Sequence, residues 1–418
     1  MNFLKIAYSN SITNKKNYWL TVLLFSFGIA IISLIFLIND QLEKQLYANS
    51  AKTDLVVGAK GSPLQLILST IYHIDNPTGN IKIEEANKLL KNPLLKKSIP
   101  VSLGDSYQGY RIVGTNKDYI EHFKIDLEIG NFPGHALEAV LGWEVAEKTG
   151  LKIGDTFAGS HGLETESFHV HDEHLYTVTG ILSKSGKVHD RLIITDLESV
   201  WIMHHDDEHN HEHGHHHHGD DEHHNHAHYF TDVDEWKNAI DKEITALIIT
   251  YKAPTAVVTF PRFVNSNTNL QAASPAFETA RLLTLLTSVT DVIKILAVLI
   301  IAIAVLSIFS GLYNTLKERK NELSVMRTLG ASKSKLFLIT VSEGMIISLV
   351  GLFFGIIGSH LLLYFIVYFV DLPINVNFFI FIEEEIYIII SALIIGFVAS
   401  AIPSLGIYNK NIAESLPE

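Results

Sequence analysis

Four long apolar runs constrain this 418-residue chain more than any other feature of its sequence. They lie at residues 19–38, 289–313, 336–370 and 386–406. A helix needs about 20 mainly apolar residues to cross the hydrocarbon core of a bilayer, and each run is long enough. The third run exceeds one upright crossing, so we expect it to tilt or to extend beyond the bilayer. The sequence therefore predicts a membrane protein with four transmembrane α-helices.

The composition agrees with this class of protein. The chain is 47% hydrophobic and only 18% charged, whereas a soluble protein of this length usually carries more charge. Its net charge of -13 sits mainly in the middle of the chain, while residues 1–18 and 314–335, which flank apolar runs, are basic. This distribution argues against nucleic acid as a partner. The absence of cysteine excludes a disulfide framework.

The charges beside the apolar runs predict the orientation of the chain in the membrane. Residues 1–18 predict an amphipathic helix on the inner membrane face, residues 314–335 are also basic, and Lys410 follows the last run in the tail at 407–418. Short loops rich in Lys and Arg stay in the cytoplasm. Residues 371–385 carry three consecutive glutamates and no Lys or Arg, which is typical of an outer loop. Because no small-x-small cleavage site follows the first run, we expect a retained anchor and two cytoplasmic termini.

Residues 39–288 contain no comparable apolar run and are predicted to form one large extracytoplasmic domain. Residues 41–47 continue the first helix. Alternating apolar residues and turn signals predict both strands and helices, hence an α+β class. We expect strands at residues 54–58, 110–114, 176–182, 192–195 and 246–251, and helices at 63–71, 83–90 and within 140–150. Ser62 and the proline after it are typical of the start of a helix.

The predicted cytoplasmic loop between the second and third runs carries a distinctive motif. Residues 322–329 predict a short amphipathic helix that ends at Gly330, with Leu323, Met326 and Leu329 on one face. The loop resembles the coupling segment of the MacB/FtsX family of ABC-transporter permeases, which reads ERxxExxxxRxxGAS just inside their second span. The matching residues are Glu318, Arg319, Glu322, Arg327, Gly330, Ala331 and Ser332.

Two blocks of the predicted outer domain carry the same resemblance. Residues 140–156 and 176–182 are similar to the patterns "LG..vA..l.l..Gd.f" and "y.VtGil" of the MacB-like periplasmic core. This likeness implies a domain of two lobes, the second inserted at about residues 130–230. Residues 54–64 and 72–79 resemble a phrase from one uncharacterised branch of these permeases, for which we know no role.

The resemblance implies a permease in the bacterial inner membrane. The chain has no G-x-x-x-x-G-K-[ST] loop, so it is not expected to be an enzyme; ATP would be hydrolysed by a separate cytoplasmic ABC ATPase. The loop at residues 316–336 would dock that ATPase, two permeases would pair, and a periplasmic adaptor or lipoprotein would assist. Efflux or release of a periplasmic or membrane substrate is the expected activity. An FtsX-like transducer, which moves no substrate and acts on a periplasmic partner, is the alternative.

A histidine-rich segment at residues 204–228 holds thirteen of the 22 histidines, interleaved with Asp and Glu. Imidazole and carboxylate groups suit Zn²⁺, and also Ni²⁺ or Cu²⁺. Because no ordered scaffold is expected here, we predict loose binding of several ions and no tightly bound cofactor; a solvated low-complexity loop is the alternative. The candidate ligands are His204, His205, His209, His211, His213, His215, His216, His217, His218, His223, His224, His226 and His228.

The sequence His211-Glu-His-Gly-His215 matches the H-E-x-x-H motif of zinc proteases only formally. That motif requires a helix, which Gly214 and its polar neighbours disfavour. We therefore reject a protease assignment through Glu212.

A smaller cluster at His169, His171 and His174 is a second candidate metal site, with separate surface histidines as the alternative. His73 is expected to be structural.

Several polar or small residues lie in or beside the apolar runs. Gly351, Gly355 and Ser359 recur every four residues and predict close helix packing, either within one chain or in a dimer. Asp291 and Lys294 are three residues apart and would pair. His360 is predicted to be a hydrogen-bonded packing residue.

Overall fold

The computed structural model describes residues 15–50, 52–161, 170–209, 234–318, 325, 326, 328, 330–370 and 376–408. The chain divides into two compact units, which we call the helical bundle and the α+β domain. The bundle comprises Met1–Glu43, Leu285–Leu372 and Val376–Glu418, and the α+β domain comprises Lys44–Thr284 with Pro373–Asn375.

Four helices of the described residues are long and apolar enough to cross a membrane. They are α2 (Lys15–Ser50), α9 (Pro275–Glu318), α11 (Lys333–Val370) and α12 (Glu383–Tyr408). Each coincides with one of the four predicted runs. Of the predicted helix at residues 1–18, residues 1–14 lie outside the described residues, and residues 15–18 belong to the start of α2.

The helices are longer than the apolar runs that predicted them. Helix α2 continues to Ser50, which agrees with the predicted extension through residues 41–47. Helix α9 starts at Pro275, within the segment assigned to the domain, because proline suits the first position of a helix. Helix α12 starts at Glu383, so the last three residues of the predicted outer loop are helical. Its first turn holds three glutamates, and carboxylates are favourable near the positive end of the helix dipole.

The interior of the bundle is an apolar core to which all four helices contribute. Phe25 and Ile29 of α2 are fully or almost fully buried there with Ile308 of α9, and Ile347 of α11 and Ile388 of α12 complete the core. Burial of large apolar side chains is the main stabilising contribution to such packing inside the bundle.

The small residues of α11 face α2 of the same chain. A Cβ atom built on Gly351 would lie 2.8 Å from Phe25 Cδ1, and one on Gly355 would lie 2.7 Å from Ile29 Cγ2. One further turn along, the hydroxyls of Ser359 and Ser33 are 2.9 Å apart. These contacts bring the two helices together more closely than larger side chains would allow.

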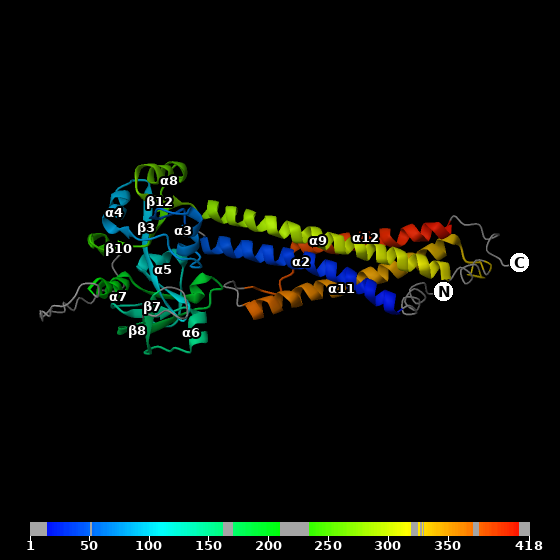
Figure 1. Ribbon diagram of the computed structural model, residues 1–418, viewed down its shortest axis with the longest axis horizontal. Coiled ribbons are helices and arrows are strands. Elements are labelled where there is room, and N and C mark those ends of the chain that lie inside the picture. The colour runs from blue at the N-terminus through cyan, green and yellow to red at the C-terminus, as the bar shows by residue number, and fades with distance from the viewer. Residues whose placement is uncertain are drawn as a thin grey trace. The chain divides into compact units, whose positions relative to one another are not determined.

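The α+β domain is built on a sheet to which ten of the described strands contribute (Figure 1). Its order is β12-β1-β11-β3-β4-β9-β6-β8-β5, and β7 pairs with β3 and β8. The strands are β1 (Leu55–Ala59), β3 (Leu95–Tyr107), β4 (Tyr110–Thr115), β5 (Leu127–Gly130), β6 (Glu138–Leu141), β7 (Thr156–His161), β8 (Val170–Leu182), β9 (Leu192–Asp196), β11 (Ala246–Tyr251) and β12 (Leu270–Ala273). A separate pair is formed by β2 (Ile81–Lys82) and β10 (Glu243–Ile244).

Helices cover this sheet and enclose two hydrophobic cores. They are α3 (Pro63–Thr70), α4 (Ile83–Leu90), α5 (Lys117–Phe123), α6 (Trp143–Thr149), α7 (Leu197–His209) and α8 (Ala256–Asn267). One core gathers around Trp236 and Phe260, the other around Tyr176 and Ile193. The sheet is continuous through β3, which pairs with β11 along one part and with β4 along the next. The division into two lobes at about residues 130–230 therefore remains a prediction.

Most predicted elements of the domain are present. Ser62 caps α3 as expected, because its hydroxyl accepts a hydrogen bond from the Gln65 amide at 3.4 Å. Two elements differ from the prediction. Strand β8 begins at Val170, six residues before its predicted start. Residues 140–150 begin as a strand and turn into α6 at Gly142, where a Cβ atom would lie 2.4 Å from the Asp190 carbonyl oxygen.

The contact between α2 and α11 can be tested with two matched glycines. Gly355→Ala should lower the unfolding free energy of the chain in lipid discs by about 1–3 kcal/mol, because the methyl group overpacks against Ile29 and the Ser26 carbonyl. Gly358→Ala is the control: it lies on the same helix, and its Cβ atom would be 3.7 Å from Ala30 Cβ, an ordinary contact. Equal stability of the two variants would contradict this packing.

Candidate functional site

The motif predicted to couple the chain to an ATPase contains a helix end and a helix start. Gly330 has a φ of +95°, which favours glycine, and the Ala331 amide donates to the Met326 carbonyl at 2.9 Å. This is the hydrogen bond of a Schellman helix end. The Ser332 carbonyl then accepts hydrogen bonds from the Lys335 and Leu336 amides at the beginning of α11. The Gly-Ala-Ser sequence therefore ends one helix and starts the next.

The structure describes only a few residues of the charged part of this motif. Val325, Met326 and Thr328 are helical, as predicted, and Glu318 is the last residue of α9. Arg319, Glu322 and Arg327 lie outside the described residues, as do Leu323 and Leu329. Their role in binding an ATPase stays a prediction.

Tyr72 forms hydrogen bonds with two long helices inside the α+β domain. Its buried hydroxyl donates to the carbonyl of Leu46 in α2 at 3.1 Å and contacts the Thr279 hydroxyl in α9 at 2.5 Å. Burial raises the pKa of Tyr72, so the phenol stays protonated. Nearby, the Asn49 side chain of α2 accepts a hydrogen bond from the Val188 amide at 3.3 Å. The segment at residues 72–79, for which the sequence indicated no role, thus holds the ends of both helices through Tyr72.

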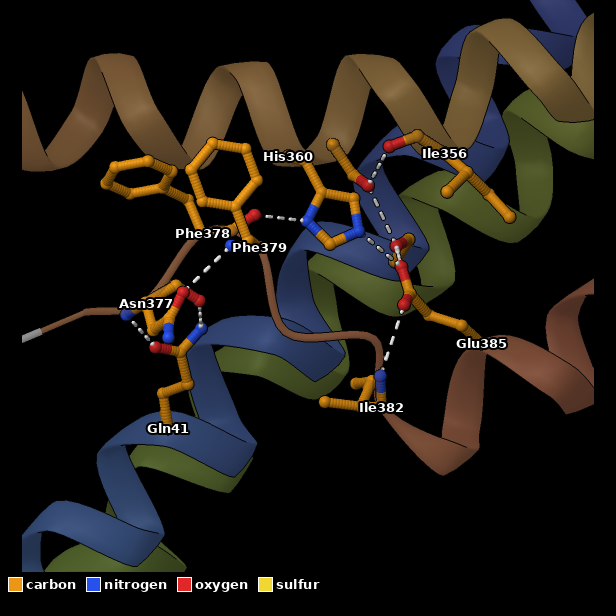
Figure 2. A network of polar contacts seen from close by, with 10 residues as sticks. Gln41, Ile356, His360, Asn377, Phe378, Phe379, Ile382 and Glu385 are labelled. Atoms are coloured by element: carbon orange, nitrogen blue, oxygen red, sulfur yellow. Dashed lines mark hydrogen bonds and ion pairs between the residues drawn. The ribbon is translucent and has the colours of Figure 1, made fainter.

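The helical bundle contains a network of buried polar groups around Glu385 (Figure 2). The Glu385 side chain is completely buried. One carboxylate oxygen accepts a hydrogen bond from the Ser33 hydroxyl at 2.8 Å and lies 3.1 Å from Nε2 of His360. The other oxygen accepts from the Ile382 amide at 3.2 Å. Three different helices and the segment before α12 therefore meet at one carboxylate.

The network extends from His360 and Ser33 to the segment before α12. Nδ1 of His360 lies 2.7 Å from the Phe378 carbonyl oxygen. The side-chain amide of Gln41 forms two hydrogen bonds with the backbone of Asn377. It donates to the Asn377 carbonyl at 3.1 Å and accepts from the Asn377 backbone N–H at 2.7 Å (Figure 2). Polar groups in an apolar interior are costly unless partnered, and a fully partnered network fixes one arrangement of its elements.

Sequence reasoning found only part of this network. The hydrogen-bonded packing role predicted for His360 agrees with its two contacts. Glu385 was missed because it was assigned to an exposed loop, and Ser33 was missed because it lies within an apolar run. The predicted pair of Asp291 and Lys294 is present at 2.9 Å, but it is exposed and such pairs contribute little.

Most of the predicted metal ligands lie outside the described residues. His171 and His174 belong to β8, and His204, His205 and His209 belong to α7. The other candidates, His169, His211, His213, His215, His216, His217, His218, His223, His224, His226 and His228, lie outside the described residues. Within the described part of the chain, no three His, Asp or Glu side chains form a metal-binding group. The start of the histidine-rich segment is helical, although no ordered scaffold was expected there.

Three other histidines of the α+β domain lie in its interior: His73 and His189 are buried, and His122 is half-buried. His73 contacts the Tyr119 hydroxyl at 3.3 Å, which agrees with its predicted structural role. His189 packs against Phe123 with ring centroids 4.8 Å apart, and His122 contacts the Thr53 hydroxyl at 3.1 Å. Burial lowers the pKa of His122 to about 4 and that of His189 to about 3, and it also lowers the pKa of His73. These rings are therefore neutral at pH 7.

Two protein families match the chain, one over most of its N-terminal part and one over its C-terminal part. Residues 18–280 match the family described as MacB-like periplasmic core domain, and residues 294–412 match the family described as FtsX-like permease C-terminal. No curated protein matches the chain.

Two solved structures are similar to part of the chain. The periplasmic region of MacB from Actinobacillus actinomycetemcomitans shares 11% identity, with a TM-score of 0.32 over 58% of this chain and 97% of that one. The extracellular domain of the noncanonic ABC-type transporter YknZ from Gram-positive bacteria shares 13% identity, with a TM-score of 0.29 over 53% and 99%. The two family matches together span nearly the whole chain. The chain belongs to the MacB/FtsX family of ABC-transporter permeases.

Proposed function

We propose that this chain transmits the movement of a separate cytoplasmic ABC ATPase through the membrane to its α+β domain. Permeases of this family work with such an ATPase. The observation that carries the proposal is that α2 and α9 continue without a break from the bundle into the α+β domain. Tyr72 binds both helix ends within that domain, so displacement of the helices must act on it.

The two helices have the length and stiffness that this task requires. At 1.5 Å per residue, the 44 residues of α9 extend about 66 Å, more than twice the ~30 Å hydrocarbon core. Neither helix contains a proline after its first residue, and proline is the common cause of a helix kink. A push at the end near Glu318 would therefore reach Thr279 with little loss through bending.

The orientation follows from the charge distribution. We propose that both termini and residues 316–336 lie in the cytoplasm of a bacterium, with the α+β domain on the outer side of the inner membrane. The basic loop and the acidic first turn of α12 support this orientation. A second copy of the chain and an outer adaptor or lipoprotein are the proposed partners.

Two versions of this function differ in what the movement accomplishes. In the first, the α+β domain binds a substrate and each ATPase cycle expels or releases it. In the second, the domain activates a protein partner and no substrate moves. The bundle contains an apolar core to which all four long helices contribute, and this core favours transmission of movement over passage of a polar solute through that part of one chain. ATP hydrolysis stimulated by a small molecule or lipid supports the first version, and stimulation only by a protein supports the second.

The coupling motif can be tested in the complex with its ATPase. Arg327→Ala and Glu322→Ala should abolish stimulation of ATP hydrolysis by the permease, because they remove the charges predicted to contact the ATPase. Circular dichroism should show an unchanged α+β domain. Lys148→Ala is the control, since Lys148 is exposed on α6 and lies outside the predicted docking loop. Normal stimulation in both motif variants would contradict the proposed docking role.

We further propose that residues 204–228 bind Zn²⁺, Ni²⁺ or Cu²⁺ in an exchangeable manner. Deletion of this segment should remove most of the Zn²⁺ bound by the full chain in a calorimetric titration, because it holds most of the histidines. Alanine substitution of His169, His171 and His174 is the comparison. Equal binding by the deleted chain would contradict the role of the segment, and loss of binding only in the triple variant would move the site there.

A further inference from the structure

A pocket of about 120 Å³ lies in the α+β domain, between the end of α5 and the loop that follows β8. A water molecule needs about 10–15 Å³ by the same measure, so the pocket can hold a group of several non-hydrogen atoms. Phe123, Ile125 and Leu182 supply its apolar surface. The other lining residues are polar, and three of them are lysines, namely Lys124, Lys184 and Lys187.

Two of these lysines are placed to attract a negatively charged group. The ammonium of Lys184 lies over the ring of Trp143, 3.8 Å from its centre, and is engaged there by a cation–π interaction. Lys124 and Lys187 form no ion pair with any other described residue. Lys187 is half-buried, so its charge is less screened by water than that of a fully exposed lysine.

The two aspartates that also line the pocket oppose this attraction only weakly. The Asp190 carboxylate is turned toward its own loop. It accepts hydrogen bonds from the Ser185 amide at 2.9 Å, the Ser185 hydroxyl at 2.7 Å and the Gly186 amide at 2.8 Å. Asp126 is exposed, so water and salt screen its charge. The enclosed part of the pocket is therefore positive.

His189 adds a hydrogen-bonding group that lacks a partner. It lines the pocket, is only 2% exposed, and its Nε2 atom has no hydrogen-bond partner among the described residues. Burial and the nearby charge of Lys187 lower the pKa of His189 to about 3, so the ring is neutral at pH 7. A neutral imidazole that carries its proton on Nε2 can donate it in a hydrogen bond. An anionic oxygen in the pocket would supply the acceptor.

We propose that this pocket binds the phosphate group of a small ligand, held by Lys124, Lys187 and His189. A lysine ammonium is a compact charge with three donors, which suits the several oxygens of a phosphate. The planar fork of an arginine, which suits a carboxylate, is absent from the described residues that line the pocket. Phosphate is therefore favoured over carboxylate.

The wall of the pocket is connected directly to the end of α2. Val188 lies between Lys187 and His189 in the chain, and its backbone amide donates to the buried Asn49 side chain of α2 at 3.3 Å. A ligand that draws Lys187 and His189 toward itself would displace Val188 and load this hydrogen bond. Binding itself does not depend on the proposed function, but an effect of the ligand on ATP hydrolysis rests on it.

Calorimetric titration of the full-length chain in lipid discs with glycerol 3-phosphate tests the pocket. We expect saturable binding, and none of glycerol, which lacks the phosphate. Lys124→Gln combined with Lys187→Gln should weaken binding at least tenfold, because it removes both ammonium groups. Lys91→Gln combined with Lys96→Gln is the control, since it removes the same charge from exposed lysines outside the pocket. Absence of saturable binding, or equal weakening in both double variants, would overturn the proposal.

The same titration in phosphatidylcholine discs with and without phosphatidic acid identifies the source of the phosphate. Competition by phosphatidic acid that is lost in the Lys124 and Lys187 variant assigns the pocket to a lipid headgroup. Equal binding in both kinds of disc assigns it to a soluble phosphate ester. Either result requires the site proposed here.

The complex with the ATPase separates this proposal from the proposed function. Glycerol 3-phosphate should change the rate of ATP hydrolysis at least twofold, and Asn49→Ala should lose this response while it still binds the ligand. Binding without any change in ATP hydrolysis would support the pocket and contradict the proposed transmission. A full response in Asn49→Ala would contradict the connection through Val188.

Discussion

Unbroken backbone hydrogen bonding along α2 and α9 is the constraint on which the rest of this structure depends. A segment inside a bilayer must satisfy its amide and carbonyl groups internally, and a continuous helix does this at every residue. The same continuity carries both helices beyond the bundle into the α+β domain, where Tyr72 fastens them.

Two kinds of contact keep the bundle helices in register. Apolar side chains supply most of the buried surface, but such burial is non-directional and tolerates sliding. The glycines of α11 leave room for Phe25 and Ile29 only at particular positions along the helix. The polar groups around Glu385 can form their hydrogen bonds in only one arrangement of the helices. Because α2, α11 and α12 share these contacts, a displacement of one of them is opposed unless the network opens.

The sequence predicts the elements of this structure better than the contacts between them. Apolar runs and strand alternation locate the four long helices and most strands, because these patterns depend on local residue order. The burial of Glu385 could not be predicted, since it requires Ser33 and His360 from distant parts of the chain. Tyr72 was recognised as part of a characteristic phrase, but its role depends on Leu46 and Thr279. The sites that matter most arise from such long-range contacts.

The central claim is that helix continuity transmits movement, and a distance measurement tests it most directly. Spin labels at Gln108 in the α+β domain and Tyr387 in the bundle would report the distance between the units in the complex with the ATPase. We expect this distance to change on ATP binding in the intact chain and to stop responding after insertion of Gly-Gly-Ser behind Thr284 in α9. The same insertion at the exposed turn beside Gly154 in the α+β domain should leave the response intact. An unchanged distance with ATP, or a normal response after the α9 insertion, would contradict the account.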